Sequence, residues 1–131
     1  MRTKTLLAVA AFLVAGTAAF AHHSYSATYD VRQKVTLEGK LVQFVFKNPH
    51  SFVTIQAPDT TGVMRRWSLE WSGTAQLNNQ GVTRESLKPG DEVIAVGNPS
   101  RVTGEFKALM ISLKRPSDGF SWGGRTGEAV D

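Results

Sequence analysis

The sequence predicts an all-β protein, a small five-stranded OB-fold-like Greek-key barrel with one short helix between strands 3 and 4. After residue 34, apolar and polar residues alternate in five stretches, and turns rich in Gly, Pro and Asp separate these stretches. One further segment has no β-branched run, which favours a helix there. An SH3-like small barrel is the alternative. Both are closed sheets, so function must be argued from the site and not from the fold.

The first predicted strand begins at Val35 and is long and bent. Its apolar residues share one parity as far as Leu41 and occupy both parities from there to Phe46. Gly39 is the predicted position of a bulge, because a residue without Cβ tolerates the dihedral angles that redirect a strand. The Lys-Asn-Pro-His segment at 47–50 is then expected to form a turn.

The remaining elements follow from the same signals. Strands are predicted at residues 51–56, 63–71, 92–97 and about 106–114, and the helix is predicted at the TAQLNNQ segment, 74–80. Ser72 is the expected N-cap of this helix and Gly81 its end.

Aromatic residues suggest where the core lies. Trp67 and Trp71 share a strand face with Leu69, which predicts that all three are buried. Either Phe44 or Phe46, on the opposite parity of the bent strand, would then face outward. An exposed ring on a small barrel is also a typical platform for stacking sugars or bases.

Residues 1–21 have the pattern of an export signal. Arg2 and Lys4 give a charged start, an apolar stretch follows, and Ala19 and Ala21 put small residues where a signal peptidase reads. We expect cleavage after Ala21 and a periplasmic or secreted protein. The apolar run Leu6–Gly16 is about half of the ~20 residues that a membrane-spanning helix needs, so no stable membrane anchor is expected.

The mature chain divides into three parts. Residues 22–34 are predicted to be an extended N-terminal lead-in, 35–115 the barrel, and 116–131 a flexible Gly/Ser-rich tail. Cleavage removes 21 of 131 residues and two basic side chains, which leaves 110 residues with 13 basic and 11 acidic side chains. A net charge of +2 without a basic stripe does not predict a nucleic-acid partner.

Composition excludes several kinds of chemistry. The chain has no Cys, which rules out disulfides, thiolate zinc sites, iron–sulfur clusters and thiol catalysis.

Four sequence segments resemble those of a known family. They are His22-His23-Ser24 after the expected cleavage site, Asn48-Pro49-His50-Ser51 after a strand that begins Val35-Thr36-Leu37-Glu38-Gly39, Trp67-Ser68-Leu69-Glu70, and Leu87-Lys88-Pro89-Gly90-Asp91. In these the chain is similar to small exported bacterial proteins that are grouped as a domain of unknown function. The resemblance implies export and a small β-barrel, and it implies no activity and no catalytic residue.

The three histidines form the candidate metal site. His22 and His23 follow the expected cleavage site, and His50 ends the first predicted turn. After cleavage, the α-amine and imidazole of His22 can chelate one ion, with His50 as the third nitrogen ligand. Such nitrogen-rich, planar coordination suits Cu(II). His23 offers a competing mode, in which the amine, a deprotonated amide and its own imidazole bind the ion.

Two other interpretations stand beside copper. Zinc uses three protein ligands and an open position, and Glu70 or Asp30 could supply the third ligand. Alternatively the histidines are structural, with His22 and His23 solvated and His50 holding its turn. On that view Glu70 is a solvated side chain or pairs with Arg66.

We therefore expect a non-enzymatic exported binding protein that sequesters copper or hands it on. The alternative is an OB-like adaptor of the cell envelope that binds a small ligand or a protein partner without metal. Binding that requires a free His22 amine would favour the copper protein, and binding that does not require it would favour the adaptor. A copper-dependent oxidant is a third reading, although a mature barrel of 110 residues offers little area to position a large substrate.

Overall fold

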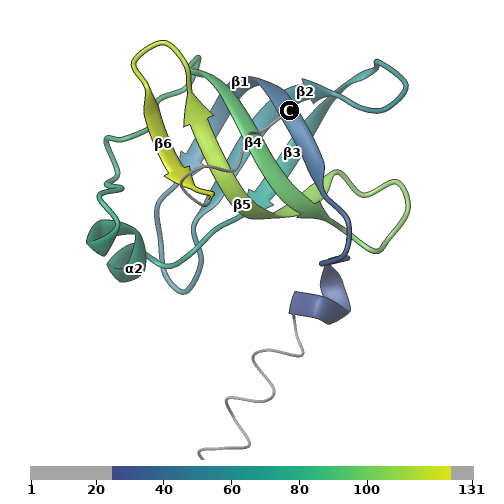
Figure 1. Cartoon of the computed structure of the whole chain (residues 1–131), viewed down its shortest axis with the longest axis horizontal. Helices are drawn as coiled ribbons and strands as arrows, with labels where there is room; N and C mark the ends of the chain where they lie inside the picture. Colours follow the sequence, from purple (N-terminus) through teal and green to yellow (C-terminus); the bar gives the residue numbers. More distant parts are fainter. Residues whose placement is uncertain (1–24, 125–131) are drawn as a thin grey trace, which may run out of the picture.

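The computed structural model describes residues 25–124, which form a mostly β structure with short helices (Figure 1). One helical turn occupies 25–28. The other elements are β1 (Val35–Val45), β2 (Phe52–Pro58), β3 (Met64–Glu70), α2 (Thr74–Asn79), β4 (Glu92–Pro99), β5 (Lys107–Arg115) and β6 (Phe120–Gly123).

Five of the strands close into a barrel. Their order is β3-β2-β1-β4-β5, and a parallel pairing of β3 with β5 joins the two ends. Neighbouring strands within this order are antiparallel. The predicted barrel, with its short helix between β3 and β4, is therefore confirmed, and β6 extends the sheet beyond β5.

β1 is long enough to pair with β4 through its first half and with β2 through its second half. The sequence predicted a bulge at Gly39, but the register shifts further along the strand, between Leu41 and Gln43. Gly39 has a different role, because a Cβ at this position would collide with the backbone oxygen of Gln56. Glycine thus allows the two strands to approach each other at the bend.

The barrel interior holds the predicted aromatic core. Trp67 is 8% exposed, Trp71 2% and Leu69 0%. Phe44 and Phe46 are both half-buried against this core, so neither is the fully outward ring that the parity suggested. Burial of these side chains provides the stability that a domain without disulfides requires.

α2 is capped from another segment of the chain. Its N-cap is Gly73, which has no side chain, and the prediction that Ser72 caps the helix is wrong. Instead the side-chain oxygen Oδ1 of Asn48 accepts hydrogen bonds from the Thr74 backbone N–H at 2.9 Å and from its hydroxyl at 3.0 Å. The turn before β2 is thereby tied to the helix.

The segment after β5 is more ordered than the predicted flexible tail. β6 pairs antiparallel with β5, and its Trp122 packs edge-on against Trp71 with ring centroids 4.9 Å apart. The alternation of aromatic and small residues in Phe-Ser-Trp-Gly was the available strand signal. Residues 125–131 of the predicted tail lie outside the described residues.

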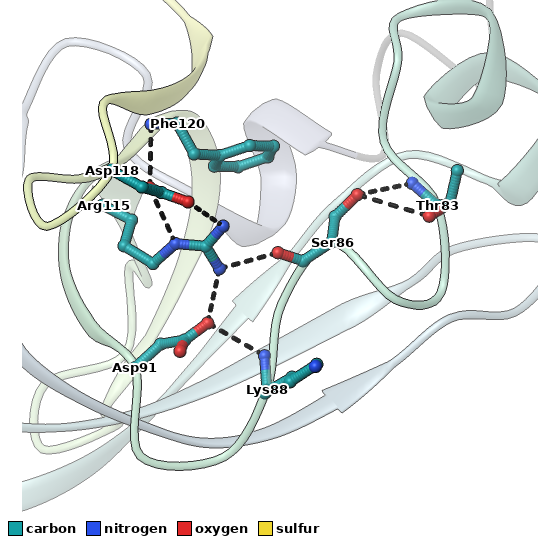
Figure 2. A network of polar contacts seen from close by, with 7 residues as sticks. All are labelled: Thr83, Ser86, Lys88, Asp91, Arg115, Asp118 and Phe120. Carbon is teal, nitrogen blue, oxygen red and sulfur yellow. Dashed lines mark hydrogen bonds and ion pairs between the residues drawn. The ribbon is translucent and has the colours of Figure 1, made fainter.

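One arginine ties the turn between β5 and β6 to the loop before β4. Figure 2 shows the Arg115 guanidinium between two carboxylates, 2.6 Å from Asp91 and 2.8 Å from Asp118. The same group donates to the backbone oxygen of Ser86 at 2.7 Å. Asp118 in turn accepts from the backbone N–H of Phe120 at 3.1 Å, at the start of β6.

The chain before β1 is fastened to the barrel. Residues 25–28 are helical, whereas the sequence analysis expected an extended lead-in. After this turn Tyr29 forms a β-bridge with Ser100, and the Asn98 side chain donates to the Gln33 backbone oxygen at 2.7 Å. Within residues 25–124 no helix is long and apolar enough to cross a membrane.

Candidate functional site: a histidine held between a glutamate and a tyrosine

His50 lies in the turn between β1 and β2, directly after the cis peptide bond that joins Asn48 to Pro49. Its side chain is 37% exposed, and both ring nitrogens have partners. Nδ1 lies 2.6 Å from Oε1 of Glu70, and Nε2 lies 2.8 Å from the hydroxyl of Tyr25. Since a carboxylate only accepts hydrogen bonds, Nδ1 carries a hydrogen, and in the neutral imidazole the lone pair is then on Nε2.

Glu70 is the last residue of β3 and lies on the strand face opposite the buried Leu69. Its side chain is nevertheless only 16% exposed. One oxygen accepts from His50 and the other from the hydroxyl of Tyr29 at 2.6 Å. Both carboxylate oxygens therefore serve to orient neighbouring side chains.

The two tyrosines come from the segment before β1. Tyr25 and Tyr29 are four residues apart, a spacing that places them on the same side of a helical turn. Burial raises the pKa of the Tyr25 phenol, and the Glu70 carboxylate raises it further. The pKa of Tyr29 is raised more strongly, by burial and then by its hydrogen bond to Glu70. Both phenols are thus neutral at neutral pH, and Nε2 of the neutral His50 ring accepts a hydrogen bond from the Tyr25 hydroxyl.

A pocket of about 350 Å³ adjoins this network. Its wall combines polar side chains of the network with residues from the end of β3, from α2 and from β5, among them Tyr25, His50, Glu70, Trp71, Gln76 and Met110. The volume lies at the lower end of the range of small-ligand sites. The pocket can therefore admit an ion with its remaining ligands, or a small molecule.

Comparison with known proteins identifies a family. Residues 10–108 match the family described as "Family of unknown function (DUF6152)". The chain belongs to the DUF6152 family. The matched range includes all three histidines and Glu70. Neither the curated proteins nor the solved structures contain a match.

The structure of this DUF6152 protein describes only part of the predicted metal site. His22 and His23 lie outside the described residues. Within residues 25–124, no three His, Asp or Glu side chains gather as a metal-binding group. A metal site at His50 would therefore need a ligand of another type or from outside this range.

The two carboxylates considered for zinc differ in their surroundings. Glu70 contacts His50 through Oε1 and Tyr29 through Oε2. Asp30 instead forms an ion pair with Arg32 at 3.1 Å and accepts from the Gln33 side chain at 3.2 Å. Of the two carboxylates, Glu70 is the one in contact with His50, a predicted metal ligand.

Sequence reasoning missed the part that Tyr25 and Tyr29 play in this DUF6152 protein. Their four-residue spacing was the available signal, because it places both side chains on one side of a helical turn. We expected this segment to be extended, so the spacing carried no prediction. Their partners lie 25 and 41 residues further along the chain. No local pattern indicates such distant contacts.

Proposed function

We propose that the processed protein binds one Cu(II) ion beside the turn between β1 and β2, and that it sequesters this ion or hands it on in the periplasm or outside the cell. The ligands in this proposal are the α-amine and imidazole of His22 and Nε2 of His50. His23 supplies the competing binding mode.

One observation carries the proposal: Nε2 of His50 faces the segment that follows the predicted new N-terminus. Nε2 is 2.8 Å from the hydroxyl of Tyr25. His22 is three residues before Tyr25, so their Cα atoms are at most about 11 Å apart along the chain. The connection is therefore short enough for a terminal amine and imidazole to meet Nε2.

The Glu70 contact supports a metal-binding role for His50. Histidines that bind metals usually donate their second ring N–H to a carboxylate or carbonyl, which fixes the tautomer and orients the ring. Glu70 accepts from Nδ1 in this way at 2.6 Å. The carboxylate also adds a negative charge near the proposed cation.

The same contacts favour copper over zinc. Glu70 as a third zinc ligand would have to release His50 or Tyr29, because each of its oxygens already accepts from one of them. Ligation through nitrogen alone leaves both contacts intact. Cu(II) also binds nitrogen ligands more tightly than the other divalent first-row metals.

The test is a Cu(II) titration of protein shown by mass spectrometry to begin at His22. We expect one ion per chain, with paramagnetic resonance that reports three nitrogen ligands. His50→Ala should weaken binding by at least about tenfold. A single Met before His22 should weaken binding similarly, because it removes the amine from the chelate.

His23→Ala is the matched control, since it removes an imidazole and keeps the His22 chelate. Unchanged affinity in His23→Ala together with a loss in His50→Ala fits the proposal. Loss in His23→Ala and none in His50→Ala would assign the metal to the competing mode. Weak binding that is indifferent to His50 would refute a copper function.

Binding of an organic ligand without metal is the second candidate, and a groove at the other end of the barrel favours it. Figure 1 shows the β2–β3 and β5–β6 turns projecting from the end that lies away from α2. A groove of about 740 Å³ is lined by residues of both regions and of β1 and β4, among them Glu38, Lys40, Met64, Ile94, Pro116 and Ser117. Pro116 follows Arg115, and the contacts of Arg115 with Asp91 and Asp118 fix this side of the groove (Figure 2). Ligand binding that persists when the His22 amine is blocked would support this candidate.

A further inference from the structure

We propose that the groove between the β2–β3 and β5–β6 turns binds a small amphipathic cation, an amine with an apolar body. This inference rests on the second candidate function, ligand binding in this groove, and names the chemical class of the ligand. It does not depend on copper, because the groove shares no lining residue with the pocket at His50.

The floor of the groove is the outer face of β1 and β4. Leu37 is buried in the core, so Glu38 and Lys40, which have the opposite parity on β1, lie on the outside. In β4, Ile94 is the partner of Glu38, and Glu92 is the partner of Lys40. Directly opposite residues of two paired strands share a face. The floor therefore carries three charged side chains around one apolar side chain.

The charges of this floor leave one carboxylate without a cation. Nζ of Lys40 lies 4.0 Å from Oε1 of Glu92, so these two charges compensate each other. Within residues 25–124, Glu38 has no ion pair. Lys114 is the partner of Ile94 on β5, but it does not line the groove. Glu38 is therefore available to a positive charge on a ligand, and it would repel an anion.

The walls of the groove offer apolar surface. On the β2–β3 side Met64 is 53% exposed, and its neighbour Val63 is 48% exposed. Pro116 lines the groove on the β5–β6 side. Exposed apolar side chains that gather at a groove are typical of ligand-binding surfaces. The apolar body of the ligand would cover Met64 and Pro116 while its cation meets Glu38.

Hydrogen bonds of two aspartates hold the walls in place. In the β2–β3 turn Asp59 accepts from the backbone N–H of Thr61 at 2.8 Å and from the Arg65 guanidinium at 2.9 Å. In the β5–β6 turn Asp118 accepts from Arg115 at 2.8 Å (Figure 2). Binding does not have to order either turn, which lowers its cost. The groove volume of about 740 Å³ is within the range of small-molecule sites.

The experiment is an NMR titration of the processed protein with octylamine, 1-octanol and octanoate. These probes share one hydrocarbon chain and differ in charge, because the amine is protonated and octanoate is ionised at neutral pH. We expect octylamine to shift the backbone amide signals of residues 38–40, 92–94 and 116–117. It should bind at least about threefold more tightly than either of the other probes, the size of effect that an exposed charge pair gives.

Two pairs of variants test the charge and the apolar wall. Glu38→Gln keeps the shape and removes the charge, and it should weaken octylamine binding about two- to fivefold. Glu85→Gln, the same change at an exposed position outside the groove, should leave binding unchanged. Met64→Ser should weaken all three probes about threefold or more. Val102→Ser, at an exposed apolar position outside the groove, should weaken none of them.

The outcomes separate the ligand class from ligand binding itself. Equal affinity of the three probes in the groove, or tighter binding of octanoate, would overturn the cationic class and leave ligand binding in the groove standing. Equal effects of Glu38→Gln and Glu85→Gln would overturn it in the same way. Absence of shifts, or shifts confined to other surfaces, would refute both. His50→Ala should leave octylamine binding unchanged, so that the copper titration tests its own function separately.

Discussion

Glu70 controls the site at the scale of a single residue, because its two oxygens orient His50 and Tyr29. Glu70→Gln keeps the shape but turns one acceptor oxygen into a donor NH2 group that faces another donor. We expect unfolding to become easier by about 1–3 kcal/mol. We also expect Cu(II) affinity to fall by about 10–100-fold, as is usual when the partner of a metal-binding histidine is lost. Urea titration and copper titration measure the two effects.

Tyr29→Phe is the control for this prediction. It removes one hydrogen bond to Glu70 and preserves the contact between Glu70 and His50. Stability should fall by about 1 kcal/mol, while copper affinity should change far less than in Glu70→Gln. Equal losses of affinity in the two variants would mean that overall stability, and not the orientation of His50, governs binding.

At the scale of elements, the junction between the β1–β2 turn and α2 depends on Asn48. Its side-chain oxygen binds two donors of Thr74, and a Cβ at Gly73 would come within 2.7 Å of the Pro49 backbone oxygen. Asn48→Ala should therefore lower the free energy of unfolding by about 1 kcal/mol, the usual cost of losing an N-cap. Urea unfolding measures this loss. Asn78→Ala, at an exposed position of α2, should change stability by less than about 0.5 kcal/mol, and an equal loss there would argue against capping by Asn48.

The same junction shows how far sequence reasoning reaches at this scale. Alternating apolar residues predicted the strands and the short helix, because a strand side chain faces either the core or the outside according to its parity. We predicted that Ser72 caps the helix, whereas the side chain that accepts from the Thr74 N–H belongs to Asn48, 26 residues before Thr74. The contacts between Tyr25, His50 and Glu70 likewise depend on how the barrel closes, and residue patterns along the chain do not record this. His50 itself was found from its residue type and its place after Pro49.

At the scale of the whole molecule, paired carboxylates should make stability depend on pH. Arg115 lowers the pKa of Asp118 through a hydrogen bond. Burial alone would raise the pKa of Asp91, but hydrogen bonds from Lys88 and Arg115 outweigh it and lower the pKa. The pKa values of Asp30, Asp59 and Glu105 are lowered as well, chiefly by hydrogen bonds from Arg32, Thr61 and Ser100 respectively.

A carboxylate with a lowered pKa stabilises the folded state above its ordinary pKa, and this contribution disappears as the pH falls through the lower folded value. The ordinary values are 3.8 for Asp and 4.5 for Glu. The urea midpoint should therefore be nearly constant between about pH 7 and 5 and fall steeply below about pH 4. Arg115→Met removes the cation that Asp91 and Asp118 share. At neutral pH its urea midpoint should be lower than that of the unmodified protein, and the midpoint should fall by less when the pH is lowered. A parallel decline in both proteins would show that this arginine network does not link folding to pH.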